Sequence, residues 1–172
     1  MRARGVDADF RATGQTGIFI SGRGIAVDSV VSDFVSGAAE WLSPDAAPSH
    51  WDVIEGQGSL FHPAYAGVTL GLIHGSQPDA LVLCHDFTRR HLADYEGYPI
   101  PTFDACFEAY LCAARLTNPA ARFAGISLNT SGVDETAAAR AVAEVAARTA
   151  QPCCDPIRHG VGAIVDGILA PG

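Results

Sequence analysis

The stretch ATGQTGIFISGRGIAVD, residues 12–28, decides the fold. It clusters glycines and polar side chains around a short apolar run at residues 18–20. Glycine lets a backbone approach a ligand closely and adopt positive φ angles. Asp28 stands where we expect a helix to begin, and the free N–H groups at the start of a helix favour anions. The stretch predicts a small-molecule or phosphate site opening an α/β domain; a plain connector between strand and helix is the alternative.

Outward from this stretch, apolar strand-like runs alternate with helical patterns along the whole chain. Such alternation predicts a parallel sheet of about five strands with helices on both faces. The expected strands lie within residues 9–20, at 51–54, 80–84 and 123–129, and from 152 onward, and the expected helices are 28–42, 63–73, 102–116, 134–149 and 161–169.

Polar clusters follow four of the expected strands. They begin at Gln15, Glu55, His85 and Asn129. Ligands of parallel sheets sit at the carboxyl ends of the strands. We therefore expect these four clusters to share one rim of the sheet.

Composition limits the class of protein. The chain has 172 residues, of which 48% are hydrophobic, and this is enough for a single α/β domain spanning residues 1–172 with a proper core. A net charge of −8 argues against a nucleic-acid or anionic-membrane partner. The 11 basic residues are all arginine, so a lysine base or Schiff base is excluded. Arginine suits bidentate binding of carboxylate or phosphate.

The five cysteines follow no disulfide framework, and their odd number predicts a reduced, cytoplasmic protein. No His/Cys pairs have the spacing of a zinc site, so we expect no metal ligands of that kind. The N-terminus shows no signal peptide, and no run of about 18 apolar residues predicts a membrane span.

Three longer stretches, residues 12–42, 50–86 and 114–131, carry a resemblance to a known family. They resemble the C-terminal domain of the bacterial DUF1611 family, whose characterised members are D-glutamate N-acetyltransferases that use acetyl-CoA. The resemblance runs from about Gly5 to about Val165, nearly the whole chain. It implies a three-layer sandwich like that of P-loop NTPases. Family members also carry an N-terminal domain and a P-loop, and neither is found in this sequence.

The resemblance implies acetyl transfer from acetyl-CoA, as co-substrate, to the amine of D-glutamate, an acidic amino acid. The alternative is a catalytically incomplete ligand-binding or assembly module derived from a P-loop fold. We expect a homo-oligomer or a partner chain that carries the missing half, because a missing strand and helix would expose apolar surface. The Glu55-Gly-x-Gly pattern also resembles P-loop ligases of the dethiobiotin synthetase kind, where a glutamate helps to hold magnesium.

The candidate base is His62, because histidine can accept the amine proton near neutral pH. Glu55 and Asp33 are the alternatives for this catalytic role. Each also has a structural interpretation: His62 as a residue bonded to backbone before a helix, Glu55 as a turn carboxylate bonded to loop amides. The candidate substrate-binding residues are Gln15, Thr16, Arg23, Asp28 and Asn129, and the candidate cofactor-binding residues are Gly14, Gly17, Gly22, Gly24, Gly56 and Gly58.

Overall fold

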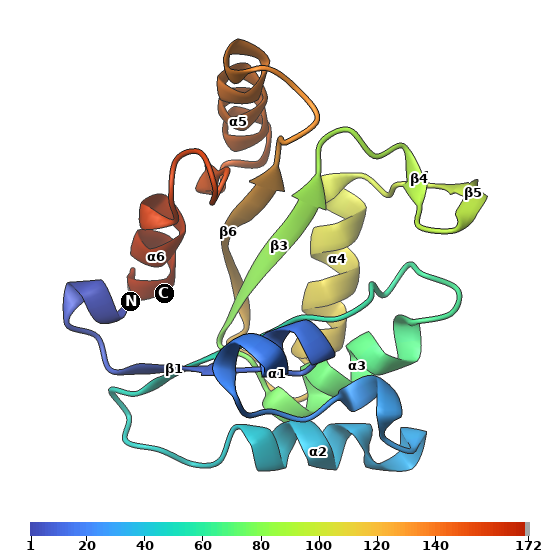
Figure 1. Ribbon diagram of the computed structural model, residues 1–172, viewed down its shortest axis with the longest axis vertical. Coiled ribbons are helices and arrows are strands. Elements are labelled where there is room, and N and C mark those ends of the chain that lie inside the picture. The colour runs from blue at the N-terminus through green and yellow to red at the C-terminus, as the bar shows by residue number, and fades with distance from the viewer. Residues whose placement is uncertain (171–172) are drawn as a thin grey trace. The chain divides into compact units, whose positions relative to one another are not determined.

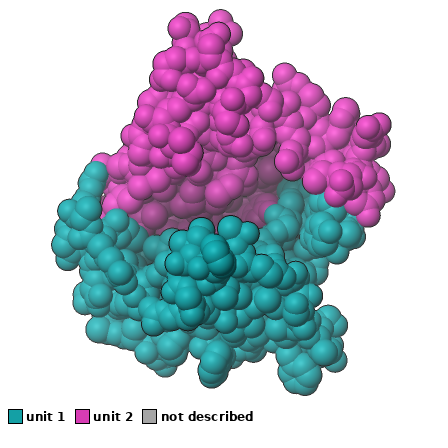
Figure 2. All heavy atoms as spheres, viewed as in Figure 1, with its two compact units in different colours: residues 1–78, 116–119 teal, residues 79–115, 120–172 magenta. Residues whose placement is uncertain are grey.

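The computed structural model describes residues 1–170, and its contacts divide the chain into two compact units (Figure 2). The first unit is Met1–Pro78 with Leu116–Pro119, and the second is Asp79–Arg115 with the segment from Ala120 onward. Each unit is described by itself.

The first unit is built on β1 (Ala8–Arg11), labelled in Figure 1, and the parallel strand β2 (Trp51–Ile54). Their register pairs Ala8 with Trp51. A short 3-10 helix (Arg2–Arg4) precedes β1. The remaining elements of this unit are α1 (Gln15–Ser21), 3-10 turns at Val27–Ser29 and Ser32–Phe34, α2 (Val35–Leu42) and α3 (Ala66–Ser76).

Helices α2 and α3 pack closely because two glycines of α3 face α2. A Cβ on Gly71 would meet the Val35 side chain, and one on Gly75 would collide with the Ser36 carbonyl. The buried side chains of Val27, Ala39 and Leu72 form the core beside this crossing.

The second unit is built on three parallel strands in the order β3 (Ala80–Asp86), β6 (Arg122–Asn129) and β7 (Cys153–Cys154). Its other elements are an antiparallel hairpin of β4 (His91–Leu92) and β5 (Tyr95–Pro99), and the helices α4 (Phe103–Ala114), α5 (Glu135–Thr149) and α6 (Gly162–Leu169).

Helices cover both faces of this three-stranded sheet. On one face, Ile126 and Leu128 of β6 pack with Ala141 and Val145 of α5 and with apolar side chains of α4. On the other face, a Cβ on Gly125 would lie 3.0 Å from the Ile164 side chain of α6. The layered α/β arrangement expected from the sequence is therefore confirmed, with the five parallel strands hydrogen-bonded in a pair and a triplet.

Most element boundaries agree with the sequence. The hairpin of β4 and β5 in the second unit was not predicted, and the other differences lie in the first unit. Residues 18–20 belong to helix α1 rather than to a strand. Asp28 lies in a 3-10 turn and does not cap a helix, because α2 begins only at Val35. Helix α3 begins at Ala66 rather than near residue 63 and continues through Gly75 to Ser76, and Gln77 caps it with a φ of 45°.

Within residues 1–170, no helix combines the length and the apolar character needed to cross a bilayer.

Candidate functional site

A carboxylate that directly follows β2 organises the glycine-rich loop after β1. Glu55 Oε2 accepts hydrogen bonds from the backbone N–H groups of Thr13, at 2.9 Å, and Gly14, at 3.0 Å. The Thr13 hydroxyl donates to the Glu55 carbonyl at 2.8 Å, and Thr13 is fully buried. Two N–H groups that the sequence offers to an anionic ligand are thus filled by a carboxylate of the chain itself. A magnesium ion at Glu55, as the sequence suggests, would have to share this engaged carboxylate.

The glycines of this loop are required where other segments come close. A Cβ on Gly14 would lie 2.6 Å from Gln57 Nε2, and one on Gly17 would collide with the Glu55 carboxylate. Gly24, with φ 149°, lies against the Ala12 carbonyl. Two further candidate glycines, Gly22 and Gly58, allow the chain to turn with positive φ angles.

Gly22 ends α1 in the left-handed region with φ 74°, and Gly58 has φ 64° where it packs against Tyr65 and Thr69. Gly56 has open space where its Cβ would be. Close contacts with the Gln57 and Glu55 side chains and with the Ala12 carbonyl therefore account for glycine at positions 14, 17 and 24.

Gln15 and Asp28 meet beside the loop. The Gln15 amide donates to both carboxylate oxygens of Asp28, at 3.1 and 3.3 Å, and both side chains are exposed. Thr16 is exposed in the first turn of α1. The segment that includes Asp28 is held to the loop by the bond from Val27 N–H to the Thr13 carbonyl, 2.9 Å. Gln15 and Asp28 therefore meet at the surface of the first unit, and Thr16 is exposed in the same helix as Gln15.

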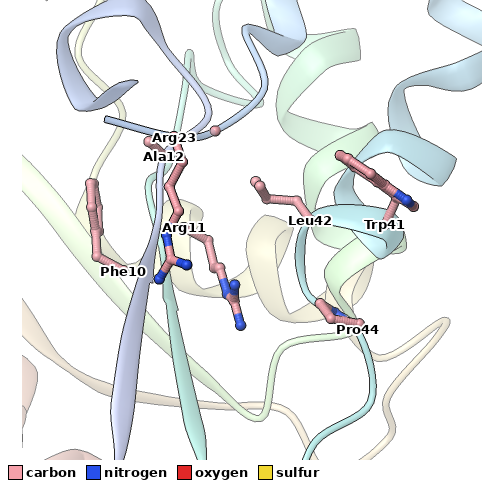
Figure 3. A pocket seen from close by; sticks show the side chains of 8 residues that line it. Phe10, Arg11, Ala12, Arg23, Trp41, Leu42 and Pro44 are labelled. Carbon is pink, nitrogen blue, oxygen red and sulfur yellow. The ribbon is translucent and has the colours of Figure 1, made fainter. Parts of the chain in front are cut away.

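Arg23 lines a pocket of about 390 Å³ in the same unit (Figure 3). Its guanidinium is exposed and lies 3.6 Å from Asp9 Oδ1. Arg11 and Trp41 line the same pocket, and Trp41 is 77% exposed. A cavity with two guanidinium groups and an indole fits a small carboxylate ligand with an apolar portion.

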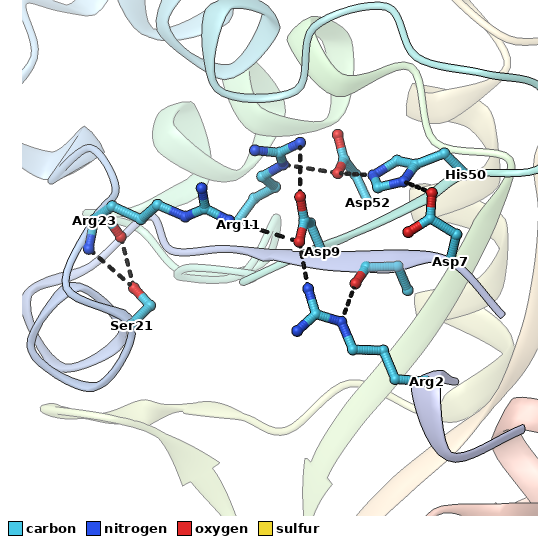
Figure 4. Close-up of polar contacts among 9 residues, drawn as sticks. Arg2, Asp7, Asp9, Arg11, Ser21, Arg23, His50 and Asp52 are labelled. Atoms are coloured by element: carbon cyan, nitrogen blue, oxygen red, sulfur yellow. Dashed lines mark hydrogen bonds and ion pairs between the residues drawn. The ribbon is translucent and has the colours of Figure 1, made fainter. Parts of the chain in front are cut away.

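An ion-pair network lies next to this pocket (Figure 4). Arg11 Nε donates to Asp52 Oδ1 at 2.7 Å, and Asp52 Oδ2 accepts from the Ser43 hydroxyl at 2.7 Å. His50 joins two carboxylates, with Nδ1 2.9 Å from Asp7 and Nε2 3.1 Å from Asp52.

The hydrogen bonds to Asp7 and then to Asp52 raise the pKa of His50 above its ordinary value, although burial opposes this. Burial raises the pKa of Asp52, but hydrogen bonds from Ser43, Arg11 and His50 outweigh it and hold that pKa below the ordinary value.

Asp9, His50 and Asp52 have the spacing of a metal site, since their ligand atoms lie within 4.8 Å of one another. Arginines already neutralise these carboxylates: Arg2, Arg11 and Arg23 pair with Asp9. A divalent cation would have to compete with three guanidinium groups at short range, so the arrangement favours an ion-pair network over a metal site.

The three candidate bases have different environments. Asp33 is exposed in its 3-10 turn, where water can solvate its carboxylate. His62 is only 6% exposed, its ring stacks on Tyr65 at 4.5 Å, and its Nδ1 accepts the Ala64 N–H at 3.2 Å. A neutral ring that accepts at Nδ1 carries its proton on Nε2 and has no lone pair left for a substrate proton. This geometry fits a positioning residue better than a base.

In the second unit, Asn129 lies at the carboxyl end of β6. Its amide donates to Asp86 Oδ2 at 3.5 Å, and its Oδ1 accepts the Ser131 N–H at 3.0 Å. His85 and Asp86 end the neighbouring strand β3. Gln15 and Glu55 therefore share the end of one strand pair, and His85 and Asn129 share the end of the other.

Sequence reasoning missed a buried carboxylate next to Asn129. Asp155 is 2% exposed and accepts from the Thr130 N–H and hydroxyl at one oxygen, and from the Ile157 and Arg158 N–H groups at the other. Burial raises the pKa of Asp155, but these hydrogen bonds, Thr130 foremost, lower it to about 2. A signal was available, since Asp155 directly follows a strand and is followed by proline.

Comparison with known proteins gives this site its context. The protein-family model for the C-terminal P-loop domain of DUF1611, a domain of unknown function, matches residues 1–165 of the chain. This chain belongs to the DUF1611 family. The crystal structure of a DUF1611 family protein from Anabaena variabilis is similar over 98% of the chain, with a TM-score of 0.90 and 38% identity. The P-loop-domain-like fold expected from the resemblance is therefore confirmed.

Two curated relatives extend the comparison. A protein from a Pseudoalteromonas species is 52% identical over 96% of the chain, and one from Tritonibacter scottomollicae is 47% identical over 99%. Both are named D-glutamate N-acetyltransferase. The DUF1611 chain described here spans about half the length of each: 50% of the first and 51% of the second.

Proposed function

We propose that this chain contributes to the transfer of an acetyl group from acetyl-CoA to the amine of D-glutamate. The observation that carries the proposal is the 52% and 47% identity to two proteins named for this activity. The chain spans about half the length of those relatives. The proposal therefore has two parts: that this reaction takes place, and that this chain carries residues that take part in it.

The reaction sets clear demands on a site. The amine nitrogen attacks the thioester carbonyl carbon, the new N–C bond forms, and the C–S bond breaks to release the thiol. The substrate ammonium group must lose a proton to attack, and the second amine proton leaves as the amide forms. A site for this reaction needs a cation for the glutamate carboxylates and an acceptor for the proton.

Two features of the first unit support the proposal. Arg23 and Arg11 line a pocket in which a guanidinium can bind a carboxylate with two parallel hydrogen bonds. Glu55 is held in place through Oε2 by two backbone N–H groups, which orient its second oxygen. We assign to Glu55 the acceptance of the amine proton and to Arg23 the binding of a substrate carboxylate. His62 positions the turn before α3.

The direct test is product analysis. The chain is incubated with acetyl-CoA and either D-glutamate or L-glutamate, and mass spectrometry measures N-acetylglutamate against a no-protein control. Acetylated D-glutamate in excess over acetylated L-glutamate is expected. If neither product exceeds the control, with this chain alone or with the remaining half of a DUF1611 protein added, the proposal fails.

We also propose that a further protein surface, from a second copy or from the remaining half, covers helix α1. Phe19 and Ile20 are 91% and 77% exposed there, and adjacent apolar side chains of this size are uncommon on an uncovered surface. All five cysteines are free thiols, which supports a cytoplasmic location.

A further inference from the structure

Three arginines of the second unit differ from the rest in their surroundings. Within residues 1–170, the guanidinium groups of Arg89, Arg90 and Arg148 have no ion pair with a carboxylate and no hydrogen bond to a carbonyl. The other arginines have partners: carboxylates for Arg2, Arg11, Arg23, Arg140 and Arg158, backbone carbonyls for Arg115 and Arg122, and an interaction of its own for Arg4.

These three arginines line one pocket of about 240 Å³. Arg89 and Arg90 come from the loop after β3, and Arg148 comes from the last turn of α5. His85, at the carboxyl end of β3, and Phe103, at the start of α4, complete the lining with Thr102 and two apolar residues.

Phe103 forms the aromatic wall of the pocket. Its ring contacts His85 edge-on, with centroids 5.2 Å apart, and the Arg148 guanidinium lies 5.8 Å from its centroid. The ring is partly buried against the core of the unit, so it fixes one side of the cavity. Arg148 is therefore held over the pocket by an aromatic face rather than by an opposite charge.

The charges in this pocket are unbalanced. Burial, and then the nearby charges of Arg89 and Arg90, lower the pKa of His85, while Asp86 opposes this. Asp86 is the acidic group next to the pocket, but its Oδ1 is engaged by the N–H and hydroxyl of Thr88. Three like charges gathered in one cavity of a chain with net charge −8 repel one another, and a bound anion relieves that repulsion.

We propose that this pocket binds the phosphate groups of the acyl donor, as a site for a phosphate ester or diphosphate. The assignment of the donor rests on the proposed function, whereas the preference for a multiply charged phosphate rests on the three guanidinium groups alone. Arginine forks match phosphate oxygens in pairs, and a 240 Å³ cavity with one aromatic wall accommodates phosphate groups with part of the attached nucleoside.

Isothermal titration calorimetry at low ionic strength tests the pocket with inorganic diphosphate, coenzyme A and D-glutamate as separate ligands. Binding of diphosphate and of coenzyme A is expected, and it weakens as salt is added. Arg148→Ala and Arg89→Ala should each raise Kd about tenfold, the effect of losing one charge-assisted hydrogen bond. Arg140→Ala is the matched control: it lies on the same helix, is exposed and pairs with Glu144.

The outcomes separate the two proposals. Diphosphate binding that Arg148→Ala weakens and Arg140→Ala leaves unchanged supports the pocket, even if no acetyl transfer is found. If Arg148→Ala and Arg140→Ala bind diphosphate with equal affinity, or if the parent chain binds no phosphate, the pocket proposal is overturned. This holds whether or not acetyl transfer is found. D-Glutamate binding that the same substitutions weaken, without phosphate binding, overturns it too, because the pocket would then be a carboxylate site.

Discussion

Glu55 Oε2 occupies the space where a Cβ on Gly17 would lie, well inside contact distance. The same oxygen accepts two backbone hydrogen bonds, so it has little freedom to move away. We predict that Gly17→Ala lowers the free energy of unfolding by about 1–3 kcal/mol, the usual cost of overpacking, despite the better helix propensity of alanine. Urea unfolding followed by circular dichroism measures this change.

Gly37→Ala is the matched control for this prediction. Gly37 also lies in a helix, α2, and a Cβ there meets nothing within 4 Å. We expect Gly37→Ala to leave stability unchanged or to raise it by up to about 1 kcal/mol. Equal effects of the two substitutions would show that Glu55 does not constrain position 17.

Removing the charge of Glu55 tests its assigned part in the chemistry. Glu55→Gln keeps an oxygen that can accept the Thr13 and Gly14 N–H groups, so the loop should persist. Because an amide cannot take the amine proton, acetyl-transfer turnover should fall about 100-fold or more. Glu40→Gln, an exposed change in α2, should leave turnover unaffected.

His62→Ala distinguishes the positioning assignment from the role of base. If His62 is the base, turnover should fall about 100-fold at neutral and alkaline pH, where the base is deprotonated, and much less in acid, so that the acidic limb of the pH profile disappears. Loss of a positioning residue should lower turnover without changing the shape of that profile, and His62→Gln should restore part of the loss through an acceptor for the Ala64 N–H. A profile that loses its acidic limb would return the role of base to His62.

Asp155 is a buried carboxylate that accepts four hydrogen bonds. The stability of the second unit should therefore depend on this side chain. We predict that Asp155→Asn lowers the free energy of unfolding by about 2–4 kcal/mol, because its amide NH₂ cannot accept from an N–H group. Glu108→Gln, an exposed change in α4, should stay within about 0.5 kcal/mol.

The pH dependence of the same residue has a definite sign. The folded-state pKa of Asp155 is lowered from 3.8 to about 2, so its contribution is present above 3.8 and is lost as the pH falls through about 2. The stability difference between the parent chain and Asp155→Asn should therefore shrink in acid. A difference that stays constant down to the lowest pH would contradict this.

The second unit was the more predictable from sequence. Thr102 and Asp134 cap α4 and α5 with their side chains, close to the expected helix starts at residues 102 and 134, because local cap chemistry decides where such helices start. Strand β3 begins with a continuous apolar run at residues 80–84, which favours a buried parallel strand.

The first unit was harder to predict because tertiary contacts override local pattern there. Residues 18–20 favour a strand by propensity, yet they form the helix α1, whose Phe19 and Ile20 are exposed. Asp28 has the chemistry of a cap but binds Gln15 instead. No local signal shows that Glu55, 42 residues from Thr13, fills the amides of the glycine loop.

The same limit applies to the cationic pocket. Arg89 and Arg90 are visible in the sequence as a basic pair, but Arg148 joins them only through the packing of α5. Which arginines lack a carboxylate partner depends on the positions of all the acidic side chains, and these positions are a property of the folded units.

Phe19 and Ile20 lead to a prediction about assembly. If a further surface covers α1, Phe19→Ser with Ile20→Ser should weaken association, because the buried apolar area falls. Multi-angle light scattering should show a smaller mass for the double variant than for the parent chain at equal concentration. Ile157→Ser, which removes an exposed side chain of the second unit, should leave the mass unchanged. The covered surface would be refuted if the parent chain stays monomeric at all concentrations and also does not associate with the remaining half of a DUF1611 protein.

The link from Asp7 through His50 to Asp52 should make the first unit sensitive to pH. Both ring nitrogens face carboxylates, so the protonated ring donates two hydrogen bonds and the neutral ring only one. Since the folded-state pKa of His50 is raised above 6.5, its contribution is fully present below 6.5 and is lost as the pH rises through the folded value.

His50→Gln should therefore destabilise the chain more at about pH 6 than at about pH 9, as measured by the urea midpoints of parent and variant in each buffer. His91→Gln, in the β4 strand of the second unit, is the control and should show no such pH-dependent difference. An NMR titration of the His50 ring checks the cause directly, and a midpoint difference that is the same in both buffers would show that the ring does not bridge the two carboxylates in its charged form.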